Sequence, residues 1–115
     1  MSWEDDVRAE MRQARTASEA GQEGRARTCA RRAIGIAITE WQRRDPSVRL
    51  GNDFLRQLTG LAEGTTTPPD VREAARRLAA RLTPDFRSAS QAPVDDAVIV
   101  LRFVFATIGS SFSPT

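Results

Sequence analysis

Residue types that commonly perform catalysis are scarce in this sequence. It has one cysteine, Cys29, and no histidine, lysine or tyrosine, so all 17 of its cationic residues are arginine. Histidine-dependent triads and most catalytic zinc sites are thereby excluded. Lysine Schiff-base chemistry and the phosphate-binding loop that ends in Gly-Lys-Ser/Thr are excluded as well. We therefore expect a protein that is not an enzyme, with no catalytic residue, no cofactor and no metal site.

Cys29 and two acidic clusters are the remaining candidates for chemistry. Cys29 lies among alanines on the apolar face of an expected helix and has no histidine to activate it, so we interpret it as a small core residue. The acidic clusters at residues 4–6 and 95–96 have the composition of metal ligands or paired carboxylates. Each cluster opens an expected helix, where acids are favoured by the helix dipole, and we interpret both as helix starts.

Arginines are concentrated in one segment of the chain. Residues 25–49 hold seven arginines and two acids, a net charge of +5, whereas the whole chain carries only +2. One interpretation is a solvated helix face with ion pairs, and the other is a surface that binds phosphate or RNA. The sequence has no tyrosine, and both tryptophans fall on apolar stripes, so few aromatic side chains are available to stack on nucleic-acid bases. The candidate anion-binding residues are Arg25, Arg27, Arg31, Arg32 and Arg102.

Arg102 is unusual because it interrupts the apolar segment 97–108. It can extend its charged end to a narrow exposed stripe, or pair with an acid such as Glu40 from another helix. A role in an interface is the functional alternative. An enzyme built on carboxylates and Arg102 is the least favoured hypothesis, because nothing in the sequence places a substrate pocket.

Hydrophobic periodicity and helix-stop signals predict five helices, at residues 3–20, 23–44, 52–63, 69–82 and 94–108. The chain length of 115 residues fits one domain, which we place at residues 1–108 with a flexible tail at 109–115. The longest apolar segment is too short to span a membrane. An acidic N-terminus and a single cysteine favour a cytoplasmic protein.

Short connections between the helices predict an all-α, antiparallel up-and-down bundle of four to five helices. In that bundle the acids at residues 4–6 face Arg43 and Arg44. The last helix is apolar almost all round, and its neighbours are rich in alanine, so we expect a second copy to cover part of it. The interface residues expected in such a homodimer are Val98, Val100, Leu101, Phe103 and Phe105.

The glycine-bearing turn at residues 20–24 and the small residues that follow it resemble the second helix of HEPN-type domains. The opening of the apolar helix at residues 94–97 resembles the last long helix of the same family. The resemblance implies a helical bundle that associates as a homodimer. Catalytic members are ribonucleases in which four to six residues separate an arginine from the histidine that follows it. Arg102 matches that arginine, but Thr107, Ile108 and Gly109 occupy positions five to seven residues later and the chain has no histidine. The function expected is therefore a non-catalytic interaction or scaffold module, and the alternative is an RNA-binding or polyanion-binding domain that uses the arginines of the second and fourth helices.

Overall fold

Local capping signals set the ends of the helices. The computed structural model describes residues 2–80, 92–110 and 112, and within these ranges it contains helices and no strand. The helices are α1 (Trp3–Glu19), α2 (Glu23–Arg44), α3 (Phe54–Glu63), α4 (Pro69–Ala79) and α5 (Pro93–Ile108). The Ser2 side chain accepts a hydrogen bond from the backbone N–H of Asp5, and Asp53 accepts one from that of Arg56. Asp53 therefore caps α3, which begins two residues later than predicted.

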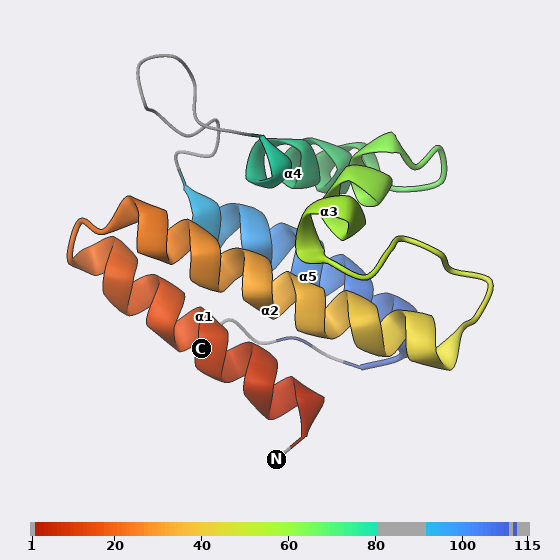
Figure 1. The fold of residues 1–115 in the computed structure, drawn as a ribbon, viewed down its shortest axis with the longest axis horizontal. Coiled ribbons are helices and arrows are strands. Elements are labelled where there is room, and N and C mark those ends of the chain that lie inside the picture. The colour runs from red at the N-terminus through yellow and green to blue at the C-terminus, as the bar shows by residue number, and fades with distance from the viewer. Residues whose placement is uncertain (1, 81–91, 111, 113–115) are drawn as a thin grey trace.

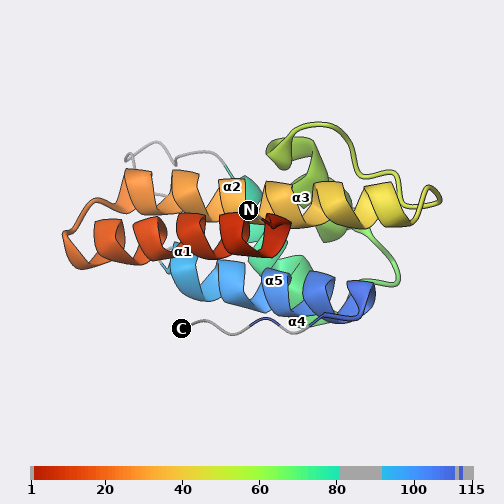
Figure 2. The same ribbon diagram turned by 90° about the horizontal axis from the view of Figure 1, so that it is seen from below.

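The predicted all-α bundle is confirmed. Figure 1 shows α1 and α2 as an antiparallel pair, and α5 running beside α2 in the same direction as α2. The short helices α3 and α4 return the chain to the end of the bundle at which α2 begins, and Figure 2 shows them on the far side of α2 and α5 from α1. Helix α4 ends at Ala79, and the last residue predicted for it, Leu82, lies outside the described residues.

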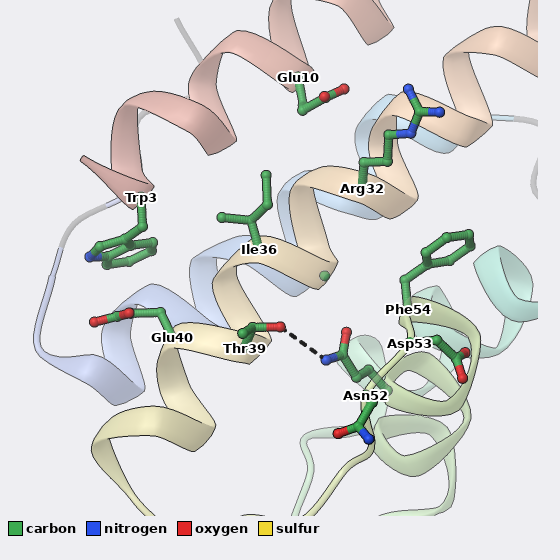
Figure 3. A pocket seen from close by; sticks show the side chains of 11 residues that line it. Trp3, Glu10, Arg32, Ile36, Thr39, Glu40, Asn52, Asp53 and Phe54 are labelled. Carbon is green, nitrogen blue, oxygen red and sulfur yellow. Dashed lines mark hydrogen bonds between the residues drawn. The ribbon is translucent and has the colours of Figure 1, made fainter. Parts of the chain in front are cut away.

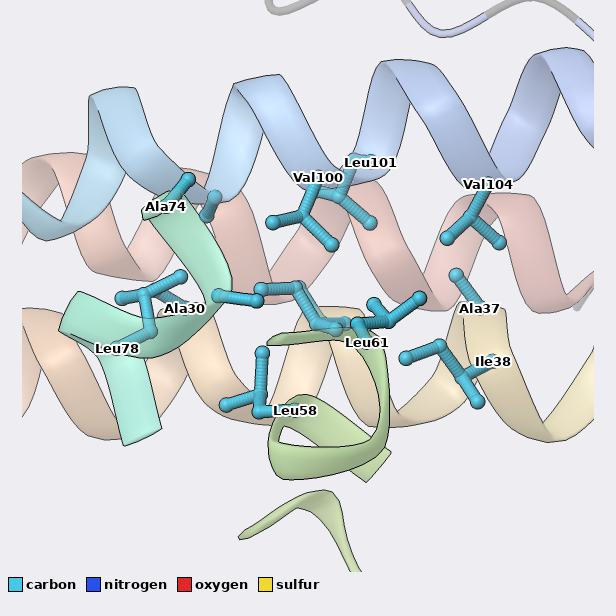
Figure 4. Packing of buried hydrophobic residues seen from close by; sticks show 14 of the residues in the cluster. Ala30, Ala37, Ile38, Leu58, Leu61, Ala74, Leu78, Val100, Leu101 and Val104 are labelled. Carbon is cyan, nitrogen blue, oxygen red and sulfur yellow. The ribbon is translucent and has the colours of Figure 1, made fainter. Parts of the chain in front are cut away.

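The core is a single cluster to which all five helices contribute, and Figure 4 shows its packing between α2, α3, α4 and α5. Helix α2 contributes mainly alanines, including Ala30, Ala33 and Ala37, which allow its neighbours to approach closely. Larger side chains from α3, α4 and α5 fill the remaining space. Among the described helices, none is long and apolar enough to cross a membrane.

The position of α5 corrects the expected homodimer interface. Val100, Leu101 and Phe105 are fully buried inside the chain, so the folded molecule offers none of them to a second copy. The neighbours cover α5 despite their many alanines because α4 and α2 pack on two sides of it. Val98 and Phe103 are half-buried, and the Phe103 ring lies edge-on to Trp41 with 5.9 Å between ring centroids.

The ends of the chain cover the rest of α5. The Trp3 ring of α1 lies 4.8 Å from the ring of Phe105, and Phe112 lies 5.0 Å from the same ring (centroid distances). The Ser110 hydroxyl donates a 2.9 Å hydrogen bond to Glu4. The expectation of a flexible tail from residue 109 therefore does not describe Ser110 and Phe112, which pack against the bundle. Gly109, in the left-handed conformation with φ 92°, ends the helix and redirects the chain.

Candidate functional site

A groove lies between α1, α2 and α3. Its volume is about 630 Å³. Figure 3 shows Trp3 at one end, Phe54 at the other and Ile36 between them, with Glu10 and Arg32 along one side. The other lining residues are Gly35, Thr39, Glu40, Asn52, Asp53 and Gln57. Most of the lining surface is apolar, and a few polar groups lie within it, which is the usual composition of a binding site.

Gly35 gives the groove its depth. A Cβ atom at this position would lie 3.3 Å from Cβ of Phe54 and 3.5 Å from Oε1 of Gln57. The missing side chain therefore lets α3 lie close to α2. It also leaves open the space directly beside the Gln57 carbonyl oxygen.

Gln57 is held rigidly below the groove by its amide nitrogen. Nε2 donates to the Thr39 hydroxyl at 3.3 Å, drawn as the dashed line in Figure 3, and to the backbone carbonyl of Gly51 at 3.2 Å. A carbonyl can only accept, so the Gly51 contact fixes which end of the amide is the nitrogen. Gln42 holds the same loop, because its Oε1 accepts from the backbone N–H groups of Leu50 and Gly51. This network fixes the position of Oε1.

Two buried oxygens of the groove lack hydrogen-bond partners. Gln57 is only 1% exposed, and its Oε1 accepts no hydrogen bond. Oε2 of Glu10 is likewise buried and without a partner. Burying an acceptor without a donor costs about 1–3 kcal/mol. Both oxygens therefore keep an unused capacity to accept a hydrogen bond.

The other acids of the groove have partners within the chain. The Glu40 side chain is 13% exposed and accepts hydrogen bonds from Arg43 and Arg44. These hydrogen bonds, that of Arg43 foremost, lower the pKa of Glu40 from 4.5 to about 2. Asp53 caps α3 and lies 3.6 Å from Arg56. Glu40 and Asp53 are therefore satisfied acids, and Glu10 is the groove carboxylate with an oxygen still unpaired.

The ends of α1 and α2 meet as predicted, but the ion pairs differ from those expected. The Arg44 guanidinium lies 5.7 Å from the centroid of the Trp3 ring, which places the start of α1 beside the end of α2. The salt bridges that the described residues make to Arg43 and Arg44 come from Glu40, one turn earlier on the same helix, and not from residues 4–6. Glu40 consequently pairs with these arginines and not with Arg102, the alternative raised from the sequence.

The candidate anion-binding arginines are not gathered into one surface. Arg31 donates to the backbone carbonyls of Leu78 at 2.6 Å and Ala80 at 3.1 Å, so it satisfies the C-terminal end of α4. Burial lowers the pKa of the Arg31 guanidinium, and the charge of Arg27 lowers it further.

The other arginines of the set lie apart. Arg25 lines a second depression between α1 and α2, and Arg27 is half-buried on α2. Arg32 lines the groove, and Arg102 is exposed on α5.

The remaining sequence candidates have structural positions. Cys29 is buried in the packing of α2. Asp96 differs from its neighbour Asp95, because it is buried and accepts two hydrogen bonds from Arg77 of α4, whereas Asp95 is exposed. The described residues contain no group of three or more side chains that could hold a metal ion.

Sequence reasoning did not find the groove. Gln57 and Gly35 are the residues that form it, and neither belongs to a motif. Two features of the sequence could have indicated the groove. Gln57 is a polar residue that immediately precedes Leu58 on the buried side of α3, and Gly35 is a small residue between Ile34 and Ile36.

No family model, curated protein or solved structure matches this chain. Its function is therefore inferred from the groove and from the residues around it.

Proposed function

We propose that this chain is a non-catalytic interaction module of the cytoplasm, which binds a segment of another protein in the groove between α1, α2 and α3. The observation that carries the proposal is the pair of unpartnered buried oxygens, Oε1 of Gln57 and Oε2 of Glu10, in an otherwise apolar groove. A protein segment has apolar side chains that can pack against the apolar walls, and N–H groups that can donate hydrogen bonds to the two oxygens.

The chemistry of the groove supports binding over catalysis. Its lining includes no serine, cysteine, histidine or lysine, and its one hydroxyl, that of Thr39, accepts a hydrogen bond from the Gln57 amide, which cannot act as a general base. The HEPN-like resemblance agrees with this role, since a member without the catalytic histidine retains its helical surfaces and lacks the nuclease motif.

Selection from a peptide library displayed on phage tests the proposal. The wild-type chain and the Gly35→Ala variant are used in parallel, because the added methyl group occupies the space beside Gln57 and lies 3.3 Å from Cβ of Phe54, so that it requires only a small shift of α3. We expect the wild type to enrich apolar peptides that the variant no longer retains. Enrichment of the same peptides by both proteins, or of none by the wild type, would show the proposal to be wrong.

We further propose that the chain associates as a homodimer through the outer face of α5. The half-buried side chains of Val98, Ile99 and Phe103 surround the exposed Arg102 there, and this apolar stripe supports the proposal. Light scattering coupled to size-exclusion chromatography, at low and high salt, should give a salt-resistant mass near twice 12.7 kDa. Val98→Asp should reduce it to a monomer, and a monomeric wild type would contradict the homodimer.

RNA or polyanion binding is the alternative function, and the structure gives it less support. Arg31 is engaged by the end of α4, Arg25 and Arg32 line different depressions, and Arg102 lies on α5. Retention of RNA in a low-salt filter assay, falling steeply as salt is added, would favour the alternative.

A further inference from the structure

The outer face of α5 carries an acid and a base on either side of an apolar centre. Residues three and four positions apart lie on one face of a helix, and on this face they form the α5 stripe: Asp95, Val98, Ile99 and Arg102. Asp95 and Arg102 are exposed at the two ends of the stripe, about two helical turns apart. Val98 and Ile99 are half-buried between them.

The α5 stripe is complementary to a second copy of itself that runs in the opposite direction. Its midpoint lies between Val98 and Ile99, and Asp95 and Arg102 are equally far from that midpoint. When two stripes pack antiparallel about this point, Asp95 of each copy lies opposite Arg102 of the other, and the apolar centres meet at the two-fold axis. A parallel arrangement would instead place each charge opposite a like charge, which is unfavourable.

Both charges of the α5 stripe are available to a partner. Among the described residues, neither Asp95 nor Arg102 takes part in a salt bridge. The positions one turn before and after Arg102 on α5 are all apolar, so the helix itself offers this arginine no acid. Arg15 and Glu19 of α1 line the depression beside Asp95, and their opposite charges offset each other. The stripe therefore presents one unpaired charge of each sign to the outside.

We propose, resting on the homodimer proposed above, that two copies of α5 pack antiparallel about the midpoint of the α5 stripe, with Asp95 of each copy paired to Arg102 of the other. The apolar centre supplies the affinity, and the two symmetry-related ion pairs set the direction and the register of the helices. Exposed ion pairs contribute little to affinity, whereas like charges brought face to face oppose association. The charges of the stripe thus select a second copy of this chain in one arrangement.

Charge reversal at either end of the α5 stripe tests this arrangement. Asp95→Arg makes both ends basic and Arg102→Asp makes both ends acidic, so each homodimer brings like charges together at two contacts. We expect each variant to raise the dimer dissociation constant, measured by sedimentation equilibrium, about thirtyfold, or about fivefold for each contact that changes from attraction to repulsion. An equal mixture of the two variants should form a heterodimer of nearly wild-type affinity, because each basic end then faces an acidic one. The variant with both reversals should recover the homodimer for the same reason.

Matched controls carry the same changes of charge outside the α5 stripe. Asp70→Arg replaces an exposed acid in the first turn of α4, so it loses the same kind of interaction with a helix dipole as Asp95→Arg. Arg12→Asp replaces an exposed arginine of α1. Neither control should weaken the dimer measurably. Far-UV circular dichroism of every variant shows whether the helices are retained.

Cysteine cross-linking determines the direction of the two helices independently of charge. Val98→Cys places a thiol beside the proposed axis, so mild oxidation should link two copies. Ala106→Cys places a thiol on the exposed side of α5 near its end, about 20 Å from its counterpart in the antiparallel arrangement and beside it in a parallel one. We therefore expect cross-linking through Val98→Cys and not through Ala106→Cys. The wild type is the control, because its one cysteine, Cys29, is buried.

The outcomes separate this arrangement from the homodimer on which it rests. A monomeric wild type would overturn both. A dimer that Val98→Asp dissociates, and whose affinity neither charge reversal changes, would overturn the arrangement and leave the homodimer through α5 intact. Weakened single variants that form no heterodimer on mixing, or cross-linking through Ala106→Cys, would likewise overturn the antiparallel register. Recovery of the dimer on mixing, with cross-linking through Val98→Cys alone, is the result that the arrangement predicts.

Discussion

The ion pair between Asp96 of α5 and Arg77 of α4 should be a main stabilising interaction between these two helices. Arg77 donates to the Asp96 carboxylate from Nη2 at 2.8 Å and from Nε at 3.2 Å. The Asp96 side chain is 8% exposed, whereas that of Arg77 is 41% exposed. This hydrogen bonding raises the pKa of the Arg77 guanidinium, which therefore stays charged at any ordinary pH.

Asp96→Ala removes the carboxylate and leaves the guanidinium without it. Breaking a buried ion pair costs about 3–5 kcal/mol when the remaining charge stays buried. Arg77 is partly exposed and can regain water, so we expect a smaller loss, about 2–3 kcal/mol in the free energy of unfolding.

Urea unfolding followed by tryptophan fluorescence measures the loss, with Asp95→Ala as the control. Asp95 lies in the same first turn of α5 but is exposed, so this variant loses the same favourable interaction with the helix dipole, about 0.3–1 kcal/mol, and no buried ion pair. The difference between the two variants measures what the buried Asp96 carboxylate contributes to stability beyond a charge in the first turn of α5. Equal destabilisation by both variants would refute the reasoning.

Three further predictions concern the helix ends. The pKa of Glu40 is lower in the folded chain than its ordinary value of 4.5. The ionised Glu40 side chain should therefore contribute fully to stability above pH 4.5, and this contribution should vanish as the pH falls towards about 2. Urea unfolding of wild type and Glu40→Gln should therefore differ by about 1 kcal/mol near neutral pH and converge in acid, and a difference that grows in acid would contradict the pairing with Arg43. Arg31→Met should cost about 1–3 kcal/mol by freeing the last carbonyls of α4, and should speed hydrogen exchange there more than in α1. Trp3→Ala should cost about 2 kcal/mol in thermal or urea unfolding through lost contact with Phe105, and no measurable loss would show that the N-terminal end of α1 does not hold α5.

Helix positions could be predicted from the sequence because the signals that set them are local. Capping by Ser2, the glycine turn after α1 and the left-handed Gly109 each act within a few residues of the helix end that they determine. The beginning of α3 shows the limit of such signals. Asn52 and Asp53 are both common caps, and only the hydrogen bond from the backbone of Arg56 shows that Asp53 is the one used.

Side-chain roles were harder to predict because they depend on distant elements. The apolar character of α5 was correctly recognised, but sequence alone could not show that α2, α4, Trp3 and Phe112 cover Phe105 and its neighbours. The roles of Arg31 and Asp96 were also missed. Arg31 acts on a helix end 47 residues away in the chain, and Asp96 pairs with a residue 19 positions earlier.

The groove itself lies between residues that no sequence pattern connects. Oε1 of Gln57 lacks a partner because the amide nitrogen of the same side chain donates to Thr39 and Gly51, which fixes the orientation of the amide. Gly35 has no side chain that could lie beside this oxygen. Each of these conditions comes from the packing of α3 on α2. A buried glutamine in the sequence is consistent with a satisfied core residue until that packing is known.

Amide NMR of the wild-type chain, titrated with a peptide enriched by library selection, tests the binding groove most directly. The structure predicts shifts at Ile36, Phe54 and the side-chain amide of Gln57, and their loss in Gly35→Ala. Shifts concentrated at Val98 and Phe103 on α5, with the groove signals unmoved, would contradict the proposal that this chain binds its partner between α1, α2 and α3.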